Sequence, residues 1–427
     1  MGSTKVQEHS KPRSIAPSTD KPIEDTDSRP LLDADSDISP TVSIVMPTMN
    51  EEAGIRECIE RVRTAVQASG YHTEVIISDD STDRTPEIAR ELGAIVVEPD
   101  QPGYGYAYRY AFERCRGDYI VIGDADTTYD FEQFPTLLDP VVNGDADIVM
   151  GSRLNGEIKP GAMPALHQYI GNPLLTKFLN TFYDAGVSDA HSGYRAFRAD
   201  VLDELNLETT GMEFASEMIM DAGARDMTIE EIPITYHERE GDATLESFRD
   251  GWRHVRFMLL NAPRYLFTIP GTIMGLLGIL VLTLAITDIT LGGATFGIHT
   301  AIAGSLLILV GFQVGSMGTF ATIASDPIKR PTDTITEGIM EHLSLERIAS
   351  LGLIIFLSGA LYASWLIIQW AQTGFTQLPM VTGDVVAFTA IVLGVQLVFN
   401  AFFMSAVATR DIQRHSPSGN HNGDYLD

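Results

Sequence analysis

Tyr119-Ile120-Val121-Ile122-Gly123-Asp124-Ala125-Asp126 is the stretch of sequence that decides the fold. Its first four residues are aromatic or β-branched, which predicts a buried strand, and Gly123 ends that strand. Two carboxylates one residue apart follow at the strand's carboxyl end. Oxygen ligands placed there can share a divalent cation with a diphosphate. Chance also supplies a D-x-D triplet in an acidic protein, so its meaning depends on the rest of the chain.

Strands and helices alternate around this stretch. The patterns predict strands over 41–47, 74–78, 94–98, 146–150 and 229–236, and helices over 52–69, up to 92, and over 107–115. Residues 154–182 are expected to form a loop and then a helix. This alternation predicts an α/β fold, a doubly wound and mainly parallel sheet that binds ligands at the carboxyl ends of its strands. Pro47, Asp79 and Asp124 each lie at such an end, so we expect them to converge.

The charge balance excludes one class of partner. The 427 residues include 57 acidic and 29 basic side chains, for a formal net charge of −28. Nucleic acid is therefore not an expected partner, because phosphate binding needs clustered cations. One interpretation of the acidic excess is a high-salt cytoplasm, where salt screens self-repulsion. The two cysteines, Cys58 and Cys115, suit neither a disulfide framework nor a metal site.

Four charge-free apolar runs follow the predicted sheet domain, at about 266–287, 300–324, 351–371 and 385–409. Each is long enough to cross a hydrocarbon core, which needs about 20 residues. Lys and Arg occur before the first run, between the second and third, and after the fourth, but not in the two remaining loops. The positive-inside rule therefore places the sheet domain and both termini in the cytoplasm. The predicted organisation is a disordered tail (1–40), a catalytic domain (41–245), an amphipathic interface helix (246–265), a four-helix transmembrane domain (266–410) and a disordered cytoplasmic tail (411–427).

Several motifs together resemble one enzyme family. Val45-Met46-Pro47-Thr48-Met49-Asn50-Glu51, Ser78-Asp79-Asp80-Ser81-Thr82-Asp83 and the D-x-D are similar, in order and spacing, to the N-terminal signatures of family 2 glycosyltransferases. Met150-Gly151-Ser152-Arg153 and Ser192-Gly193-Tyr194-Arg195 extend the likeness. Within the family the chain is most similar to dolichyl-phosphate (polyprenyl-phosphate) mannose and glucose synthases. The resemblance implies a GT-A fold, a nucleotide-diphosphate sugar donor and Mg²⁺ or Mn²⁺.

The resemblance also implies roles for particular residues. Asp124 and Asp126 would hold the metal ion, which stabilises the leaving diphosphate. The implied catalytic residues are Asp126, Arg153, Arg195 and Glu217, with the two arginines neutralising phosphate oxygens and Glu217 on the acceptor side. The implied nucleotide-sugar contacts are Pro47, Glu51, Asp79, Asp80, Asp124, Ala125 and Arg239.

Structural roles stay open for several of these residues. Glu51 could complement a helix N-terminus, Asp79 and Asp80 could be turn residues, and the arginines could pair with carboxylates. Glu217 could equally be structural. The chain also departs from the synthase pattern: Thr128 replaces a usual Gln, and Thr244 replaces a usual Lys. These departures leave the donor undefined.

The sequence thus predicts an enzyme that transfers one hexose, with inversion, from a UDP-glucose or GDP-mannose type of donor to dolichyl or polyprenyl phosphate. The reaction would occur at the cytoplasmic face of the cell membrane and feed protein glycosylation or cell-surface glycan assembly. Such an acceptor is already ionised near neutral pH, so it needs no strong general base. Two alternatives remain: a glycolipid or polysaccharide synthase with a hydroxyl acceptor, and a non-catalytic membrane scaffold or carrier. A homo-oligomer is also left open.

Overall fold

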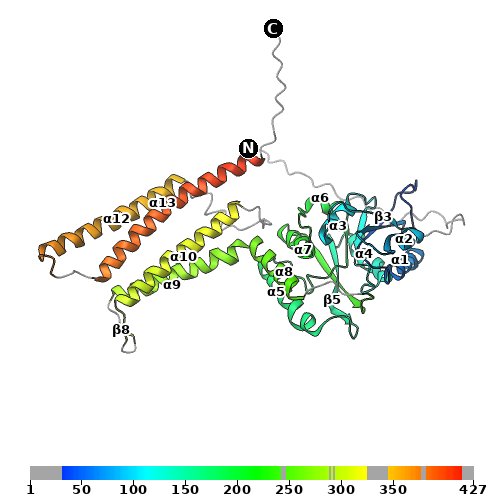
Figure 1. Ribbon diagram of the computed structural model, residues 1–427, viewed down its shortest axis with the longest axis horizontal. Helices are drawn as coiled ribbons and strands as arrows, with labels where there is room; N and C mark the ends of the chain where they lie inside the picture. Colours follow the sequence, from blue (N-terminus) through cyan, green and yellow to red (C-terminus); the bar gives the residue numbers. More distant parts are fainter. Residues whose placement is uncertain are drawn as a thin grey trace, which may run out of the picture.

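The computed structural model describes residues 31–241, 247–287, 290–291, 294–324, 345–376 and 381–415. Residues 1–30 of the predicted N-terminal tail and residues 416–427 of the predicted C-terminal tail lie outside this range. Figure 1 shows a sheet domain at one end of the molecule and long helices at the other.

A seven-stranded sheet forms the centre of the first domain. Its strands are β1 (Val42–Thr48), β2 (Thr73–Asp79), β3 (Ile95–Val97), β4 (Tyr119–Ile122), β5 (Ile148–Ile158), β6 (Arg195–Arg198) and β7 (Ile229–Tyr236). They lie in the order β3-β2-β1-β4-β6-β5-β7. All neighbours pair in parallel except β6, which is antiparallel to β4 and β5. The predicted α/β class, with a mainly parallel sheet, is confirmed.

Helices cover both faces of this sheet. They are α1 (Ile55–Ser69), α2 (Thr85–Glu91), α3 (Tyr104–Phe112), η1 (Phe131–Gln133), α4 (Phe134–Asn143), η2 (His167–Gly171), α5 (Asn172–Tyr183), α6 (Val201–Glu204) and α7 (Phe214–Ala224). Because side chains alternate across a strand, β1 sends Ile44 and Met46 toward α1 and α4, and Val45 toward α3 and α7. The sheet is therefore buried on both faces, as parallel sheets require.

Two strands differ from the sequence prediction. Residues 154–158 are not a loop, because β5 continues to Ile158 and pairs with β7 again after a register shift between Ser152 and Glu157. Arg195–Arg198 forms β6, which the sequence patterns do not predict. This strand has four residues with an arginine at each end, too short and too polar to produce an apolar pattern.

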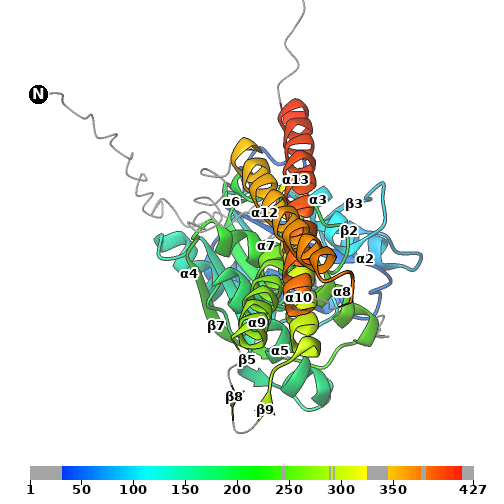
Figure 2. The same ribbon diagram turned by 90° about the vertical axis from the view of Figure 1, so that its left-hand side faces the viewer.

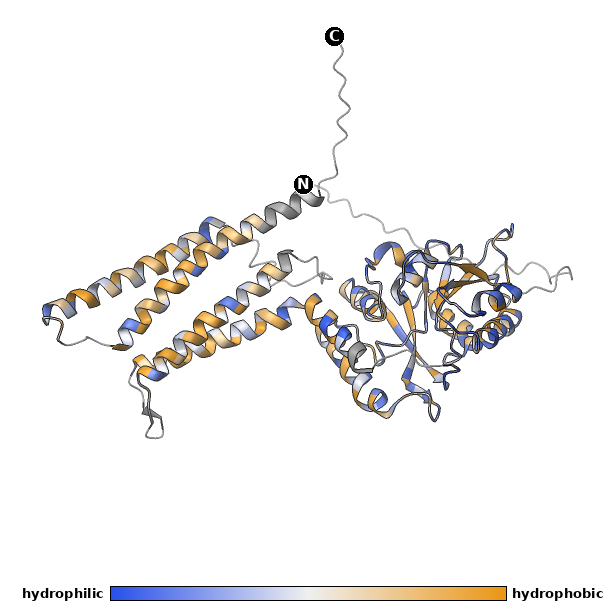
Figure 3. Ribbon diagram, viewed as in Figure 1, coloured by the Kyte–Doolittle hydropathy of each residue, from blue (hydrophilic) through white to orange (hydrophobic). Residues whose placement is uncertain are grey.

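The second part of the molecule consists of long helices. These are α8 (Ser247–Asn261), η3 (Arg264–Thr268), α9 (Ile269–Ile286), α10 (Ile298–Ala324), α12 (Leu345–Gln372) and α13 (Val381–His415), with β8 (Thr290–Leu291) and β9 (Ala294–Thr295) forming a hairpin between α9 and α10. Four segments are long and apolar enough to cross a membrane: Arg264–Ile286, Ile298–Ala321, Glu346–Gln372 and Val381–Ala406. Figure 3 shows apolar residues along the length of these helices. The four predicted spans are thus confirmed as candidates.

The long helices form two antiparallel hairpins. Figure 2, viewed from the side of these helices, shows α9 beside α10 and α12 beside α13. Glycines bring the paired backbones together, as in many membrane helix pairs: a Cβ at Gly278 would lie 2.8 Å from the carbonyl oxygen of Gly304, and one at Gly352 would lie 2.9 Å from that of Gly394. Helix α13 continues beyond its candidate span to His415.

Candidate active site

The carboxyl ends of β2, β1 and β4 bring the sequence motifs to one edge of the sheet. β1 is the middle strand of the three, with Thr48 opposite Asp79 and Val45 opposite Ile122. Asp124 follows Ile122 by two residues. Since neighbouring strands lie about 4.8 Å apart, the strands that lead to Asp79 and Asp124 are about 10 Å apart at this edge. The predicted convergence of these strand ends is confirmed.

The loop after β4 holds Asp126 in a fixed orientation. The Asp126 carboxylate accepts hydrogen bonds from the hydroxyl of Thr128 at 2.5 Å and from its backbone N–H at 3.2 Å. Between them, Thr127 has φ 67°, a left-handed conformation that is costly for a β-branched residue. The Thr127 hydroxyl donates to the backbone oxygen of Asp126 and accepts from the N–H of Glu240. Such a strained, well-supported turn is characteristic of functional loops.

Asp124 is half-buried beside the buried Asp126. Among the described residues, the Tyr104 hydroxyl is the hydrogen-bond donor to the Asp124 carboxylate, at a distance of 2.8 Å. Burial, and next the negative charge of Asp126, raise the pKa of Asp124 to about 6. Two partly compensated carboxylates of this kind have the oxygen donors that Mg²⁺ and Mn²⁺ prefer. The pair therefore fits a divalent cation.

Glu51 and Arg239 complete the acidic edge. Arg239 donates a hydrogen bond to the carboxylate of Glu51, and its second terminal nitrogen lies 3.4 Å from the carboxylate of Asp126. Burial raises the pKa of Glu51 to about 7, although Arg239 opposes this shift. Arg239 thus places one positive charge between two acidic groups.

The first two motifs interlock through their loops. Asn50 adopts a left-handed conformation with φ 62°. Its backbone N–H donates to the hydroxyl of Ser81, and its side-chain oxygen accepts from the N–H of Thr82. Asp79 is buried and accepts from the hydroxyls of Thr48 and Ser81. Asp80 is exposed, so of this acidic pair it is the side chain open to a ligand.

Pro47 and Ala125 form part of the backbone of this edge. Pro47 is half-buried within β1, opposite Ser78. Ala125 is buried between the two aspartates, and its carbonyl oxygen would lie 3.0 Å from a Cβ at Gly54. The loop after β1 therefore packs directly on the D-x-D backbone.

Both predicted phosphate-binding arginines have protein partners. Arg153 donates from Nε and Nη2 to the buried carboxylate of Asp189, each at 2.8 Å, and its guanidinium lies 5.3 Å from the centre of the Tyr236 ring. Arg195 is fully buried and donates to the carbonyl oxygens of Ser192, Ala190 and Ala215. The structure thus gives both residues a role in holding segment 189–195 beside Asp124.

Glu217 also supports a neighbouring loop. Its carboxylate accepts from the backbone N–H groups of Glu208 and Thr209 and from the Thr209 hydroxyl. The next residue, Thr210, accepts from the N–H of Gly105 through its carbonyl oxygen. Glu217 therefore positions the loop that packs against the start of α3.

Sequence reasoning missed two residues that contact Asp124. Tyr104 donates to its carboxylate, and Gly193 leaves it room, since a Cβ at 193 would lie 3.2 Å from Asp124 Oδ2. The available signals were the Gly/Tyr-rich stretch 103–106, which forms the start of α3, and the glycine of the Ser192–Arg195 motif. Thr244, one of the two departures from the synthase pattern, lies outside the described residues.

The fold and this edge define a class of protein. The chain has a mainly parallel sheet with one antiparallel strand, a D-x-D at the carboxyl edge of that sheet, and four candidate membrane spans. Together these features describe a membrane-bound glycosyltransferase of the GT-A fold.

Comparison with known proteins leads to the family. Residues 43–205 match the glycosyl transferase family 2 domain, and residues 319–408 match the glycosyltransferase family 2 C-terminal transmembrane region. The chain is 58% identical over 377 residues to the low-salt glycan biosynthesis hexosyltransferase Agl6 of Haloferax volcanii. The matched region covers 88% of this chain and 91% of that protein. It therefore belongs to glycosyltransferase family 2 and is an enzyme of that kind.

More distant similarities cover about half of the chain. A dolichyl-phosphate hexose transferase of Haloferax volcanii is 34% identical over 49% of this chain and 89% of its own length. A dolichol-phosphate mannosyltransferase of Pyrococcus furiosus is 28% identical over 56% of this chain and 70% of its own. A crystal structure of glucosyl-3-phosphoglycerate synthase from Mycobacterium tuberculosis aligns with a TM-score of 0.43 and 24% identity, covering 52% of this chain and 80% of that one.

Proposed function

We propose that this enzyme transfers one hexose from a nucleotide-diphosphate sugar to dolichyl or polyprenyl phosphate, with inversion, at the cytoplasmic face of the membrane. One observation carries the proposal: the same chain contains the Asp124–Asp126 edge and four candidate membrane spans. The names of two relatives, a dolichyl-phosphate hexose transferase and a dolichol-phosphate mannosyltransferase, support the choice of acceptor.

The acidic edge suits the diphosphate of the donor. Asp124 and Asp126 would hold Mg²⁺ or Mn²⁺, which would stabilise the negative charge of the departing nucleoside diphosphate. The described residues contain no group of three or more His, Cys, Asp or Glu side chains that could bind a metal by themselves. Phosphate oxygens and water would therefore complete the coordination, as is common for Mg²⁺. Asp80 and Glu51 would face the nucleoside, and Arg239 would contact phosphate.

The proposed acceptor simplifies the chemistry that the protein must supply. The bond between the anomeric carbon and the donor diphosphate breaks as an oxygen of the lipid phosphate forms a new bond on the opposite face. A phosphate monoester is already ionised at neutral pH, so the residues need only align it and shield its charge. Arg153 and Arg195, held beside Asp124, would contribute positive potential rather than direct contacts.

The experiment uses full-length protein in proteoliposomes. It is given radiolabelled UDP- and GDP-hexoses, Mg²⁺ or Mn²⁺, and either dolichyl phosphate or dolichol. We expect label in the phosphate lipid and none in the alcohol, and we expect Asp126→Asn to lower the rate by about 100-fold or more because charge stabilisation is lost. Asp203→Asn, an equal charge change at an exposed residue of α6, is the control. Transfer to dolichol, or full activity of Asp126→Asn, would contradict the proposal.

A further inference from the structure

The outward face of the segment that runs from Leu166, just before η2, to the first turn of α5 is apolar, although this segment belongs to the sheet domain. Leu166, Tyr169, Ile170 and Leu174 are 62%, 72%, 58% and 51% exposed. Their spacing of three and four residues places them on one side of the helical segment. The opposite side of α5 is also apolar and is buried in the domain core, so the first turn of α5 lacks the polar outer face of an ordinary surface helix. An exposed patch of this kind marks an interaction site.

The charge of the same segment is also unusual for this chain. Residues 158–183 contain Lys159 and Lys177 but no Asp or Glu, whereas the chain as a whole has 57 acidic and 29 basic residues. Lys177 is exposed and lies three residues after Leu174, so it lies on the same side of α5 as Leu174. A helix with apolar residues beside lysine is suited to the interface of an anionic bilayer.

The position of α5 connects this face to the membrane. The ring of Phe182 lies 4.4 Å from that of Tyr265, and the Tyr265 hydroxyl donates to the backbone oxygen of Thr181 at 2.9 Å. Tyr265 belongs to the first candidate span, Arg264–Ile286. Figure 1 shows α5 and α8 on the side of the sheet domain that faces the long helices. On α8, Trp252 is 60% exposed, and Trp is typical of membrane interfaces.

We propose that η2 and α5 form a membrane-docking surface, comprising Leu166, Tyr169, Ile170, Leu174 and Lys177, which lies in the headgroup layer of the bilayer that the four spans cross. The apolar side chains reach the acyl boundary and Lys177 meets anionic headgroups. The sheet domain is then held at two places, by this surface and by the connection from α8 to α9. The inference rests on the membrane spans and is independent of the sugar, the donor and the acceptor.

The test measures the environment of single spin labels on full-length protein in vesicles. Tyr169→Cys and Leu174→Cys are labelled in a Cys115→Ala background, since Cys58 is buried. Gln67→Cys, an exposed residue of α1 at the far end of the sheet domain, is the control. We expect the labels at 169 and 174 to have a higher ratio of collisions with O₂, which concentrates in lipid, to collisions with a water-soluble nickel chelate than the label at 67.

Other outcomes have definite meanings. Equal ratios at all three sites would overturn the proposal, and so would labels at 169 and 174 shielded from both reagents, because that result indicates a protein contact. The contribution of Lys177 is tested by adding Lys177→Glu or Lys177→Gln to the labelled protein. Lys177→Glu should lower the ratio more than Lys177→Gln in phosphatidylglycerol-containing vesicles and equally in pure phosphatidylcholine. No difference in the anionic vesicles would remove the electrostatic part of the proposal.

Discussion

At the scale of single residues, Gly193 controls the space around the Asp124 carboxylate. A Cβ at 193 would lie 3.2 Å from Asp124 Oδ2, 3.3 Å from the Tyr104 hydroxyl and 3.4 Å from the Tyr129 hydroxyl. These distances are close for carbon and oxygen, so an alanine would displace the carboxylate by a few tenths of an ångström. Small misplacements of a catalytic group can cost up to about 100-fold in rate.

We therefore expect Gly193→Ala to lower transfer by roughly 10- to 100-fold with little change in melting temperature. The rate and the melting curve are measured on the same preparation. Gly297→Ala is the matched control, because a Cβ at that position meets no atom within 4 Å. Activity of Gly193→Ala equal to that of the control would show that the carboxylate tolerates the methyl group.

The residues at this edge were predictable from sequence to different degrees. Asp124 and Asp126 follow a strand pattern directly, so their placement depends on local sequence alone. The contact between Tyr104 and Asp124 depends on how α3 packs against β1 and β2, which no local pattern specifies. The buried partner of Arg153 is likewise a tertiary feature, because residue type indicates that an arginine needs an acceptor but not which one.

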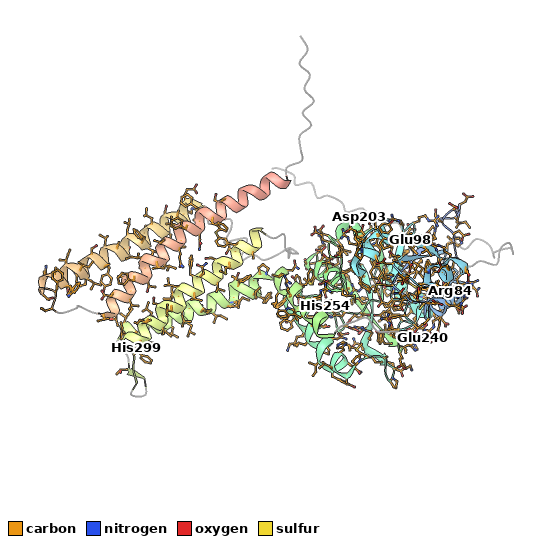
Figure 4. All side chains as sticks on the ribbon, viewed as in Figure 1. Arg84, Glu98, Asp203, Glu240, His254 and His299 are labelled. Carbon is orange, nitrogen blue, oxygen red and sulfur yellow. The ribbon has the colours of Figure 1, made fainter. Side chains whose placement is uncertain are left out.

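At the scale of secondary-structure elements, a histidine pair joins α8 to the sheet domain. The hydroxyl of Ser216, on α7, lies 3.2 Å from His191 Nε2 and 3.0 Å from His254 Nδ1, and the two rings are 4.9 Å apart. Figure 4 labels His254 on the side of the domain that faces the long helices. Burial, and next the proximity of His254, lower the pKa of His191 to about 3, while Asp189 opposes this shift.

This depressed pKa predicts a pH-dependent stability. An unfolded histidine titrates near pH 6.5, so below that pH the unfolded chain binds a proton that the folded chain excludes. The contribution of His191 is complete above about pH 6.5 and is lost as the pH falls toward 3. We expect the melting temperature to fall between pH 7.5 and pH 5, and His191→Gln to make this fall shallower. His72→Gln, at an exposed position, is the control, and identical slopes for the two variants would refute the assignment.

Glycine spacing holds α9 against α10. A Cβ at Gly278 would lie 2.6 Å from the backbone nitrogen of Ile308, and one at Gly271 would lie 2.5 Å from that of Gly315. A larger residue at either position would force the helix backbones apart. A Cβ at Gly275, on the same helix, would meet no atom within 4 Å.

Gly278→Leu is therefore expected to destabilise the helix hairpin, by about 1–3 kcal/mol for an overpacked contact, whereas Gly275→Leu should be tolerated. Thermal unfolding of the detergent-solubilised protein, followed by loss of its monodisperse peak, compares the two variants with the parent. If Gly275→Leu lost as much stability as Gly278→Leu, the close approach of α9 and α10 at Gly278 would not be the cause.

The elements themselves were predictable where a pattern is long. The apolar runs that became α9, α10, α12 and α13 exceed the length of any single strand, so composition alone identified them. β6 escaped prediction because it is an antiparallel insertion between β4 and β5, stabilised by neighbours on both sides rather than by its own residues. Sheet order is likewise a property of the whole domain.

At the scale of the whole molecule, a polar seam joins the two helix hairpins. The Ser305 and Thr389 hydroxyls lie 2.6 Å apart, Gln396 donates to Gln313 at 3.4 Å, and Asn400 donates to Ser316 at 3.0 Å. From one pair to the next, the residue numbers increase along both α10 and α13, so these two helices run parallel. The start of α9, the end of α10 and the end of α13 consequently lie at the same end of the helix bundle, on the side of the sheet domain (Figure 1).

The charge distribution indicates which side this is. Arg253 and Arg256 precede the first span, Arg264 begins it, and Arg347 lies at the start of the third. Residues 287–297, between α9 and α10, contain no Lys or Arg. The positive-inside rule therefore supports the proposal that the sheet domain lies in the cytoplasm, where nucleotide sugars for the proposed reaction would be available. The same proposal puts the hairpin that contains β9 on the opposite face.

This topology is tested with single cysteines in intact cells, again in the Cys115→Ala background. An impermeant maleimide should label Thr295→Cys, an exposed residue of β9, without permeabilisation, and should label Gln67→Cys only after the membrane is opened. Because α9 and α10 form one antiparallel hairpin, the two sites must lie on opposite faces if α9 crosses the bilayer. Labelling of both sites in intact cells would contradict the crossing itself. The reverse pattern would preserve the four spans but place the acidic edge outside, away from the proposed supply of donor.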